Sequence, residues 1–335
     1  MPRHLAPLVV AASAAVLLAG CATAAPAAAP ATTPPPPTEA AGTEYPLTID
    51  NCGFETTIDT APERVLAIKS TSIEMLLALG LEDRIIGTAF SDGPAADAWA
   101  DAADALPVIS DKVPGQEATL ELEPDLVYAG WESNLSAEGA GERDALASLG
   151  IASYVSPAAC KAAGYQPNPL TWDALWGEVA EVGEIFDAQD AASALIAAQQ
   201  AELAAVTPDD RGLTALWFSS GSDAPFVGAG IGSPQMIMDA AGLENIAADV
   251  EDTWTSYSWE AVAEADPDVI VLIDSSWGST EKKIGVLESN PVTAELTAVK
   301  EGRYLVLPFP TGEAGVRNVE AVVSLTEQLQ GLDLE

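Results

Sequence analysis

Hydrophobic positions along the chain follow two alternating spacings, and this alternation predicts an α/β fold. Short apolar runs such as 65–68 and 269–273 have the length and β-branched content of buried strands. Between such runs lie stretches with helical spacing, for example 71–80, which ends at Gly80. Strands that alternate with helices form parallel sheets with crossover helices. The expected elements are a hairpin over 45–59, strands at 65–68, 85–87, 125–129, 151–155, 213–218, 269–273 and 304–307, and helices at 71–80, 140–149, 233–241 and 318–330.

The segment 170–206 departs from this alternation. It has no strand pattern, and Trp172, Leu175 and Val179 recur at helical spacing. We expect one long linking helix there, which would be about 50 Å long if it is continuous. A break near 187–190 would divide it into two helices instead.

The halves on either side of this segment repeat one another. Glu117 and Glu260 each begin a Glu-Ala pair that is followed, after five residues, by Pro-Asp and a buried strand. A second match pairs 72–82 with 234–244, each of which is a helix that stops at a glycine before Leu-Glu. Two matches in the same order indicate two similar Rossmann-like lobes with parallel sheets, joined by the linking helix. Because ligands bind beyond the carboxyl ends of parallel strands, the loops of the two lobes are expected to face each other across a cleft.

The first 44 residues have the pattern of an export and anchoring segment. Arg3 precedes a short apolar run, as in a secretory signal peptide. Leu18-Ala19-Gly20-Cys21 matches the bacterial lipobox, in which the cysteine becomes diacylated, and an ordinary signal peptide with an incidental cysteine is the alternative. Ala, Pro, Thr and Gly then form a semi-rigid tether. We therefore expect a signal peptide over 1–20, lipidated Cys21 and a tether over 21–44, a first lobe over 45–169, the linking helix over 170–206 and a second lobe over 207–335, in a protein exported and lipid-anchored to the outer face of the cytoplasmic membrane.

The cysteine count agrees with export. If Cys21 carries the lipid, Cys52 and Cys160 remain. An even pair outside the cytoplasm most simply forms one disulfide. Two unrelated buried thiols are the alternative.

The charge of the chain excludes several classes of function. With 13 Lys and Arg against 51 Asp and Glu, the formal net charge is −38, so a nucleic-acid partner is not expected. The single histidine, His4, lies within the expected signal peptide. Histidine catalysis and a His-ligated metal site are therefore not expected, and the chain suggests no cofactor.

Polar and aromatic side chains follow several of the expected strands, where a ligand would bind. The faces of Trp131 and Trp254 suit a planar, polar small molecule, and packing inside the lobes is the alternative for each. Lys69 and Arg317 would pair with an anionic ligand, and a surface ion pair is the alternative. The candidate ligand-binding residues are Lys69, Ser70, Thr71, Lys112, Trp131, Glu132, Ser156, Ser219, Trp254, Tyr257, Trp277 and Arg317.

At residues 61–65, 72–80 and 241–246, and at the two Pro-Asp strand entries, the sequence resembles the helical-backbone class of ABC-transporter solute-binding lipoproteins. That resemblance implies a class III periplasmic-binding-protein-like fold and a ligand such as an iron–siderophore, haem or cobalamin. Four further segments resemble an actinobacterial subgroup associated with a precursor of the deazaflavin coenzyme F-420, which makes that precursor the favoured ligand. These segments are 69–72, 111–114, 128–134 and 156–160.

The resemblance also gives the repeated glutamates a role. In this class one glutamate on each lobe pairs with arginines of the membrane permease, and Glu117 and Glu260 match that position, each seven residues before the strand-entry proline. Stabilisation of a helix dipole is the alternative for both. The resemblance implies a monomer that delivers its ligand to the permease and its cytoplasmic ATPase. A carboxylate-dependent glycan hydrolase is a different hypothesis, but no nucleophile elbow, phosphate loop or zinc signature supports an enzyme. A purely structural surface lipoprotein is a third.

Overall fold

The computed structural model describes residues 42–166 and 169–332 of the chain. The expected signal peptide, the lipidation site Cys21 and the tether through residue 41 lie outside the described residues. None of the helices in the described part combines the length and the apolar character needed to cross a membrane.

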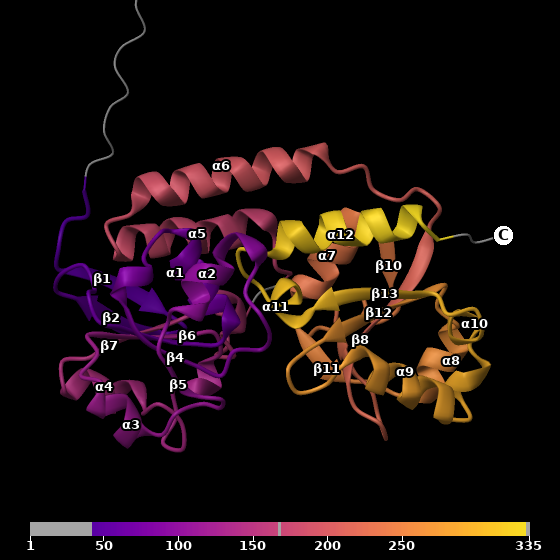
Figure 1. The fold of residues 1–335 in the computed structure, drawn as a ribbon, viewed down its shortest axis with the longest axis horizontal. Helices are drawn as coiled ribbons and strands as arrows, with labels where there is room; N and C mark the ends of the chain where they lie inside the picture. Colours follow the sequence, from indigo (N-terminus) through magenta and orange to yellow (C-terminus); the bar gives the residue numbers. More distant parts are fainter. Residues whose placement is uncertain (1–41, 167–168, 333–335) are drawn as a thin grey trace, which may run out of the picture. The chain divides into compact units, whose positions relative to one another are not determined.

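The first lobe consists of a β-hairpin and a five-stranded parallel sheet of strand order β5-β4-β3-β6-β7 (Figure 1). The hairpin expected over 45–59 from the alternation of apolar and polar residues is confirmed, since β1 and β2 pair antiparallel. The strands are β1 Leu47–Asn51, β2 Phe54–Ile58, β3 Val65–Ile68, β4 Ile85–Ala89, β5 Val108–Ser110, β6 Leu126–Ala129 and β7 Ala152–Val155, and the helices are α1 Ser70–Ala78, α2 Ala100–Asp104, α3 Gln116–Glu121 and α4 Arg143–Ser148.

The second lobe has a mixed sheet of strand order β11-β9-β8-β12-β13, in which β10 also pairs with β8. Strands β9 and β11 run antiparallel to their neighbours, and the others pair in parallel. The strands are β8 Leu213–Ser220, β9 Phe226–Gly228, β10 Leu243–Asn245, β11 Trp254–Ser256, β12 Val269–Asp274 and β13 Tyr304–Pro308, and the helices are α7 Ser233–Ala241, α8 Trp259–Ala265, α9 Thr280–Ser289, α10 Thr297–Lys300, α11 Phe309–Gly312 and α12 Asn318–Gln330.

The internal repeat is visible in the strand order. Four parallel strands of the first lobe, β4-β3-β6-β7, correspond to β10-β8-β12-β13 of the second. The repeated Pro-Asp motif has the same structural role in both lobes. The Asp125 carboxylate accepts the backbone N–H of Arg64, at 3.0 Å, just before β3, and the Asp268 carboxylate accepts that of Thr214, at 2.9 Å, in β8. Each aspartate therefore ties the start of its own strand to the start of the neighbouring one.

The segment between the lobes is a helical hairpin, so of the two possibilities left open by the sequence the continuous helix is wrong and the break near 187–190 is confirmed. Helix α5, Trp172–Ile185, and helix α6, Gln189–Ala205, are separated by a turn in which Asp187 has a φ of 56°. A left-handed residue cannot continue an α-helix, so the chain reverses there. Gly183 permits the tight return, because a Cβ at that position would lie 2.5 Å from the Cβ of Ala192.

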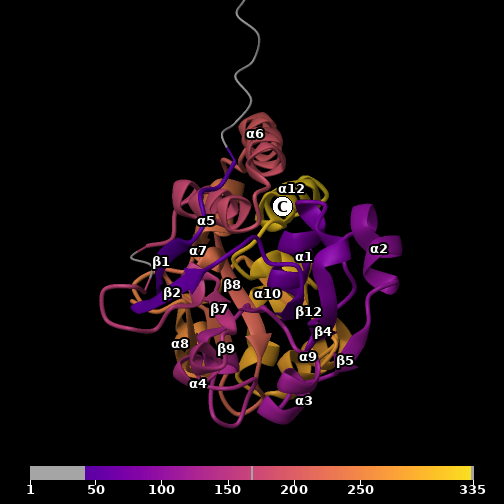
Figure 2. The same cartoon turned by 90° about the vertical axis from the view of Figure 1, so that its left-hand side faces the viewer.

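Both helices of the hairpin reach both lobes. Helix α5 contributes apolar side chains to the core of the first lobe, and its Trp172 and Leu175 also pack against residues of the second. Helix α6 packs against the first-lobe core and against α12 of the second lobe. Both views show α6 lying over α5 and α12 on one side of the molecule (Figures 1 and 2). Helix α6 thus bridges the two lobes.

Candidate ligand-binding site

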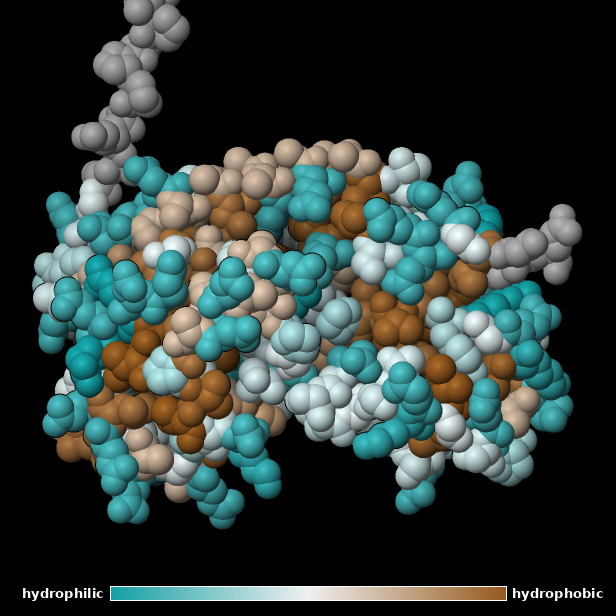
Figure 3. Space-filling model, in the orientation of Figure 1, coloured by the Kyte–Doolittle hydropathy of each residue, from teal (hydrophilic) through white to brown (hydrophobic). Residues whose placement is uncertain are grey.

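A cavity of about 630 Å³ lies between the two lobes and is lined by both. In the space-filling view the surface is hollowed between the lobes on the side away from α6 (Figure 3). First-lobe residues reach the cavity from the loops after β4, β6 and β7, and second-lobe residues reach it from the end of β8, the start of α7, β11 and α11. The carboxyl ends of the parallel strands therefore border the site, as the sequence predicts. The volume falls within the range of ordinary small-molecule sites.

Aromatic rings make up much of the cavity wall. Trp254 lies nearly parallel to Phe226, with interplanar angle 9° and centroids 6.4 Å apart, and to Phe309, with 20° and 6.1 Å. The Phe90 ring meets Trp131 edge-on across 5.9 Å. Flat faces of this kind stack on planar ligands. The aromatic lining residues are Phe90, Trp131, Phe226, Trp254, Trp277 and Phe309.

A few polar groups interrupt this aromatic wall. Ser156 is buried, and among the described residues its hydroxyl oxygen has no hydrogen-bond partner. Ser219 and Thr253 also line the cavity from the second lobe. Such groups fix the orientation of a ligand whose affinity comes from the apolar faces.

Glu313 is the most buried charged group on the wall, with 7% of its surface exposed. Its Oε2 accepts a hydrogen bond from the Trp131 indole N–H of the other lobe, at 2.5 Å, while Oε1 has no partner among the described residues. Burial raises the pKa of Glu313 to about 7, against the opposing effect of Lys69. The Asn318 amide donates to the carbonyl oxygens of Thr311 and Glu313, at 2.9 and 2.6 Å, and so fixes the backbone that carries this carboxyl group.

Lys69 does not lie on the cavity wall, although the sequence suggested it as a ligand-binding cation. Its side chain is fully buried, forms an ion pair with Asp92, and places its ammonium 3.6 Å from the centroid of the Trp131 ring and 4.4 Å from that of Phe90. Burial raises the pKa of Asp92, and the ammonium opposes that effect. The pair sits behind two aromatic wall residues, where a buried cation needs an opposite charge.

Arg317 is likewise paired inside the protein. Its guanidinium lies 3.1 Å from the Glu74 carboxylate of α1 and 2.7 Å from that of Glu320. It also donates to the Pro94 carbonyl of the first lobe, at 3.3 Å. Arg317 thus joins the second lobe to the first, and it is not part of the cavity wall.

Half of the twelve expected ligand contacts therefore lie away from the wall. The Ser70 hydroxyl accepts the Asp92 backbone N–H, at 2.9 Å, and Thr71 is buried beside it. Lys112 is exposed after β5, and Tyr257 packs against the core of the second lobe. The six that line the cavity are Trp131, Glu132, Ser156, Ser219, Trp254 and Trp277, and the six that do not are Lys69, Ser70, Thr71, Lys112, Tyr257 and Arg317.

Several wall residues are missing from the twelve candidates. Phe90 and Phe309 directly follow β4 and β13, which is the position where the sequence predicts ligand contacts, but they are not among the twelve. Lys161, Phe226 and Glu313 carry no comparable signal in the sequence. Only the folded chain brings these last three to the cavity.

Direct contacts join the lobes around the cavity. Besides the Trp131–Glu313 hydrogen bond, the Ser276 backbone N–H donates to the Asp92 carbonyl, at 2.8 Å, and the Lys161 ammonium donates to the Thr253 hydroxyl, at 3.0 Å. The structure therefore represents a conformation in which both lobes contact each other at the rim of the site.

The described residues contain no cluster of three or more His, Cys, Asp or Glu side chains that could hold a metal ion. The charged side chains on the cavity wall are Glu132, Lys161 and Glu313. No histidine, tyrosine, methionine or cysteine occurs among the described residues of the wall. The arrangement is one for binding a compound through ring faces and hydrogen bonds.

The repeated glutamates occupy equivalent places in the two lobes. Glu117 lies in the first turn of α3 and Glu260 in the first turn of α8, and both are exposed. The Ser258 hydroxyl donates to Glu260 at 3.0 Å. Helices α3 and α8 both lie on the side of the molecule away from α6 (Figure 1).

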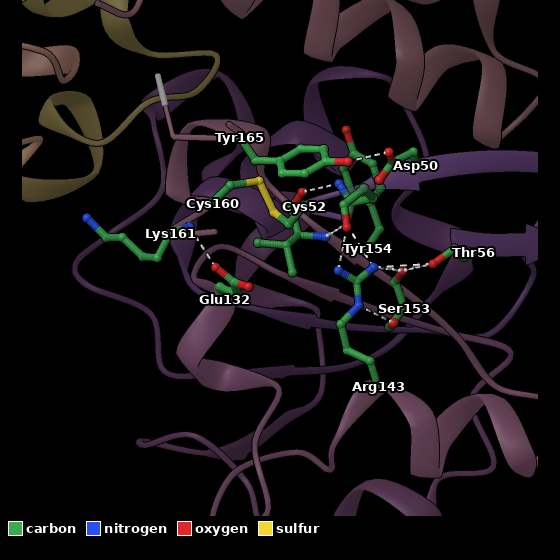
Figure 4. The surroundings of a disulfide bond; sticks show 12 residues. Asp50, Cys52, Thr56, Glu132, Arg143, Ser153, Tyr154, Cys160, Lys161 and Tyr165 are labelled. Carbon is green, nitrogen blue, oxygen red and sulfur yellow. Dashed lines mark hydrogen bonds between the residues drawn. A yellow bond between two sulfur atoms is a disulfide. The ribbon is translucent and has the colours of Figure 1, made fainter. Parts of the chain in front are cut away.

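Cys52 and Cys160 form a disulfide, which confirms the pairing expected from the cysteine count (Figure 4). The bond joins the turn of the β1–β2 hairpin to the segment that follows β7. Chain-entropy arguments give a crosslink across 108 residues a stabilisation of about 4–5 kcal/mol.

Comparison with known proteins agrees with this architecture. A family model described as "Periplasmic binding protein" matches residues 65–311. An uncharacterized ABC transporter substrate-binding lipoprotein, YvrC, from Bacillus subtilis is 25% identical over 294 residues, which are 85% of this chain and 86% of that protein. A cobalamin-binding protein from Halobacterium salinarum is 29% identical over 226 residues, 64% of this chain and 55% of that protein. Among solved structures, an ABC-type Fe3+-hydroxamate transport system protein from Saccharomonospora viridis superimposes with a TM-score of 0.75 at 26% identity, covering 85% of this chain and 99% of that one.

Proposed function

Since this chain belongs to the periplasmic binding protein family, we propose that its cavity captures a flat, uncharged heteroaromatic solute for an ABC importer. The chain is a solute-binding protein of the siderophore, haem and cobalamin type. Its relatives are substrate-binding proteins of transporters and not enzymes. The chain is therefore expected to bind its solute and to release it chemically unchanged.

The observation that carries the ligand class is an aromatic wall in which the described residues offer no unpaired buried cation. Lys69 and Arg317, the two cations expected to attract an anion, are each neutralised by a buried carboxylate. Lys161, at the rim, lies 3.4 Å from the Asp252 carboxylate. With Glu132 and Glu313 also on the wall, an anionic ligand would meet unfavourable charge in a weakly screened site. The sequence predicts a polar or anionic ligand, and we therefore narrow this class to uncharged compounds.

The deazaflavin coenzyme precursor remains the favoured ligand within this class. A riboflavin-like deazaflavin has a planar tricyclic ring, a ring N–H donor and a chain of hydroxyls, and it lacks a phosphate. Trp254 and Trp131 offer faces for the ring, and Glu313 Oε1 offers an acceptor for a ring N–H. The hydroxyls of Ser156 and Ser219 suit the polyol.

Corrinoids and ferric hydroxamates are the alternatives within the family. They rest on the names of two relatives, the cobalamin-binding protein of Halobacterium salinarum and the hydroxamate transport protein of Saccharomonospora viridis. Haem fits the wall less well. The described wall has no side chain of the kinds that bind haem iron, and the two haem carboxylates would share the cavity with Glu132 and Glu313.

Delivery to the permease is proposed to use the repeated glutamates, one on each lobe. Glu117 and Glu260 are exposed at equivalent positions, so two-fold related arginines of a permease could pair with both at once. We also infer that residues 1–20 are removed, that Cys21 carries a lipid, and that the tether over 21–44 holds a monomeric body at the outer face of the cytoplasmic membrane. The description of YvrC as a lipoprotein favours this anchoring.

Titration of the full chain with a graded set of compounds tests the ligand class. The set is riboflavin, riboflavin phosphate, the riboflavin-like deazaflavin, cyanocobalamin, a ferric hydroxamate and haemin, followed by quenching of tryptophan fluorescence. We expect the uncharged tricyclic compounds to bind, and the added phosphate to weaken binding about tenfold or more, equivalent to about 1.4 kcal/mol. Preferential binding of riboflavin phosphate or haemin would refute the charge argument.

A pair of tryptophan variants locates the binding site in the same titration. Trp254→Ala removes a ring from the centre of the aromatic wall, and we expect a loss of affinity of about tenfold or more because a stacked heterocycle contributes about 1–3 kcal/mol. Trp99→Phe is the matched control, since Trp99 packs at the edge of the first-lobe core, away from the cavity wall. Equal effects of the two substitutions would contradict the assigned site.

A further inference from the structure

The disulfide lies within a part of the cavity wall. Cys160 belongs to the segment 156–161 that follows β7, and the residues around it in this segment face the ligand site. We refer to 156–161 as the exit segment, because it leads out of β7, the last strand of the first-lobe sheet. The residues of the exit segment that line the cavity are Ser156, Ala158, Ala159 and Lys161.

Three consecutive residues of the β1–β2 hairpin hold the chain around the exit segment. The Asn51 side chain both donates to the carbonyl and accepts the N–H of Val155, each at 2.8 Å, just before the segment. Cys52 is bonded to Cys160 within it.

After the segment, the Tyr165 hydroxyl donates to the Asp50 carboxylate at 2.5 Å (Figure 4). The hairpin thus contacts the chain at residues 155, 160 and 165, that is, at intervals of five residues. The disulfide is the middle contact and the covalent one of the three.

The hairpin is itself rigid enough to act as an anchor. Cys52 and Gly53 have φ values of 57° and 77°, which is the left-handed pair of a tight two-residue turn. The Arg143 guanidinium donates to the Asn51 carbonyl, at 2.7 Å, and to the Thr56 hydroxyl, at 3.2 Å, behind the turn. A non-glycine residue is unfavourable in the left-handed region.

The exit segment also carries a contact between the lobes. The Lys161 backbone N–H donates to the Glu132 carboxylate, at 2.7 Å, on the first-lobe wall. Its ammonium reaches the Thr253 hydroxyl, at 3.0 Å, on the second-lobe wall. Because Lys161 follows Cys160 directly, displacement of the disulfide would move both contacts.

We propose that the Cys52–Cys160 disulfide is a positioning element of the ligand site, holding the exit segment and the Lys161 bridge in place for the bound solute. This rests on the proposed function only in taking the cavity as the ligand site. A disulfide that acts through chain entropy alone stabilises the whole lobe without singling out one wall. The two roles therefore differ in where the protein loosens once the bond is absent.

Amide hydrogen exchange of the ligand-free full chain separates these roles. Cys52→Ser/Cys160→Ser removes the bond, and Arg143→Met is the matched control, since it weakens the same hairpin and keeps the disulfide. Temperatures are chosen so that the variants have equal free energies of unfolding. We expect peptides covering 156–166 to exchange about tenfold faster in the cysteine variant than in the Arg143→Met control, while β3 and β6 exchange equally in both. Equal exchange of 156–166 in the two variants would overturn the proposal.

Reduction of the folded wild-type protein by a phosphine gives the same comparison if the cysteine variant does not fold. Faster exchange confined to 156–166 after reduction supports the positioning role, and exchange that rises uniformly across the first lobe or does not change refutes it. Titration of riboflavin into the wild-type protein is made alongside. If no compound of the titration set binds, the proposed function fails, whereas the exchange pattern still decides whether the disulfide holds the exit segment.

Discussion

Replacement of Lys69 by methionine distinguishes an internal ion pair from a ligand contact. The substitution removes the ammonium and keeps a flexible apolar side chain of similar length. It leaves the Asp92 carboxylate buried, with the Ser70 backbone N–H at 3.5 Å as a long remaining contact. The ammonium also leaves the faces of Trp131 and Phe90.

The expected loss of stability follows from the burial of both partners. Removing one member of a buried ion pair costs about 3–5 kcal/mol, because the other charge remains without compensation. Replacing both, as in Lys69→Met/Asp92→Leu, removes that uncompensated charge, and we expect the double variant to recover most of the loss. Burial already raises the pKa of Asp92, and loss of the ammonium raises it further. The defect of the single variant should therefore shrink as the pH is lowered and the carboxyl group takes up a proton.

Urea unfolding of the wild-type protein and the three variants completes a double-mutant cycle, with Asp92→Leu as the third variant. Affinity for the best-binding compound of the titration set is measured on the same preparations. For Lys69→Met we expect a large fall in the free energy of unfolding and a loss of ligand affinity of less than about tenfold. A variant whose stability stays within about 1 kcal/mol of wild type, but whose affinity is lost, would show that Lys69 contacts the ligand and would refute this interpretation of the site.

Three further predictions concern carboxyl groups. Glu313→Gln should lower affinity for an uncharged tricyclic ligand about tenfold and abolish the rise in affinity that the wild-type protein should show between pH 6 and 8. The rise is expected because burial raises the pKa of Glu313 to about 7 and the ionised form accepts a ligand N–H better. Titrations at both pH values check this, and unchanged affinity in the variant contradicts it. Reversing the charge at Glu117 and Glu260 together should abolish uptake by cells and leave ligand affinity intact, whereas lost affinity would refute the docking role. Burial raises the pKa values of Glu74, Glu178 and Glu313 to about 7, so the folded chain binds protons that the unfolded chain releases between about pH 4.5 and 7. The free energy of unfolding should therefore fall as the pH rises from 5.5 to 8, and urea unfolding that shows greater stability at pH 8 would contradict it.

Periodic patterns and the repeat made most of the fold predictable. Helices α7 and α12 begin and end at the residues expected from the sequence, because apolar spacing and terminal residues are local signals. The two Pro-Asp motifs identified the lobes, and the paired aspartates show that these motifs hold equivalent strands together. The sequence could not decide between one continuous helix and a break at Asp187, because helix-forming residues surround this position. The left-handed turn there depends on the packing of α6 against α5, where Ala192 lies close to Gly183.

The site was half predictable for a related reason. Residues that directly follow strands, such as Trp131 and Ser156, reach the cavity because the parallel sheet brings all strand ends to one edge. Lys69 also follows a strand, but its charge is neutralised by an aspartate 23 residues away. Arg317 is paired with Glu74, which is 243 residues distant in the sequence. Composition reveals how many cations a chain has, whereas only the fold reveals which of them are already paired.

Native mass spectrometry of the protein isolated from its own membranes tests the central claim most directly. We expect one uncharged, flat chromophore bound per chain and retained by Trp99→Phe, and its loss from Trp254→Ala. A bound solute that is anionic, or one that Trp254→Ala retains fully, would contradict the assignment of the aromatic cavity as the site of capture.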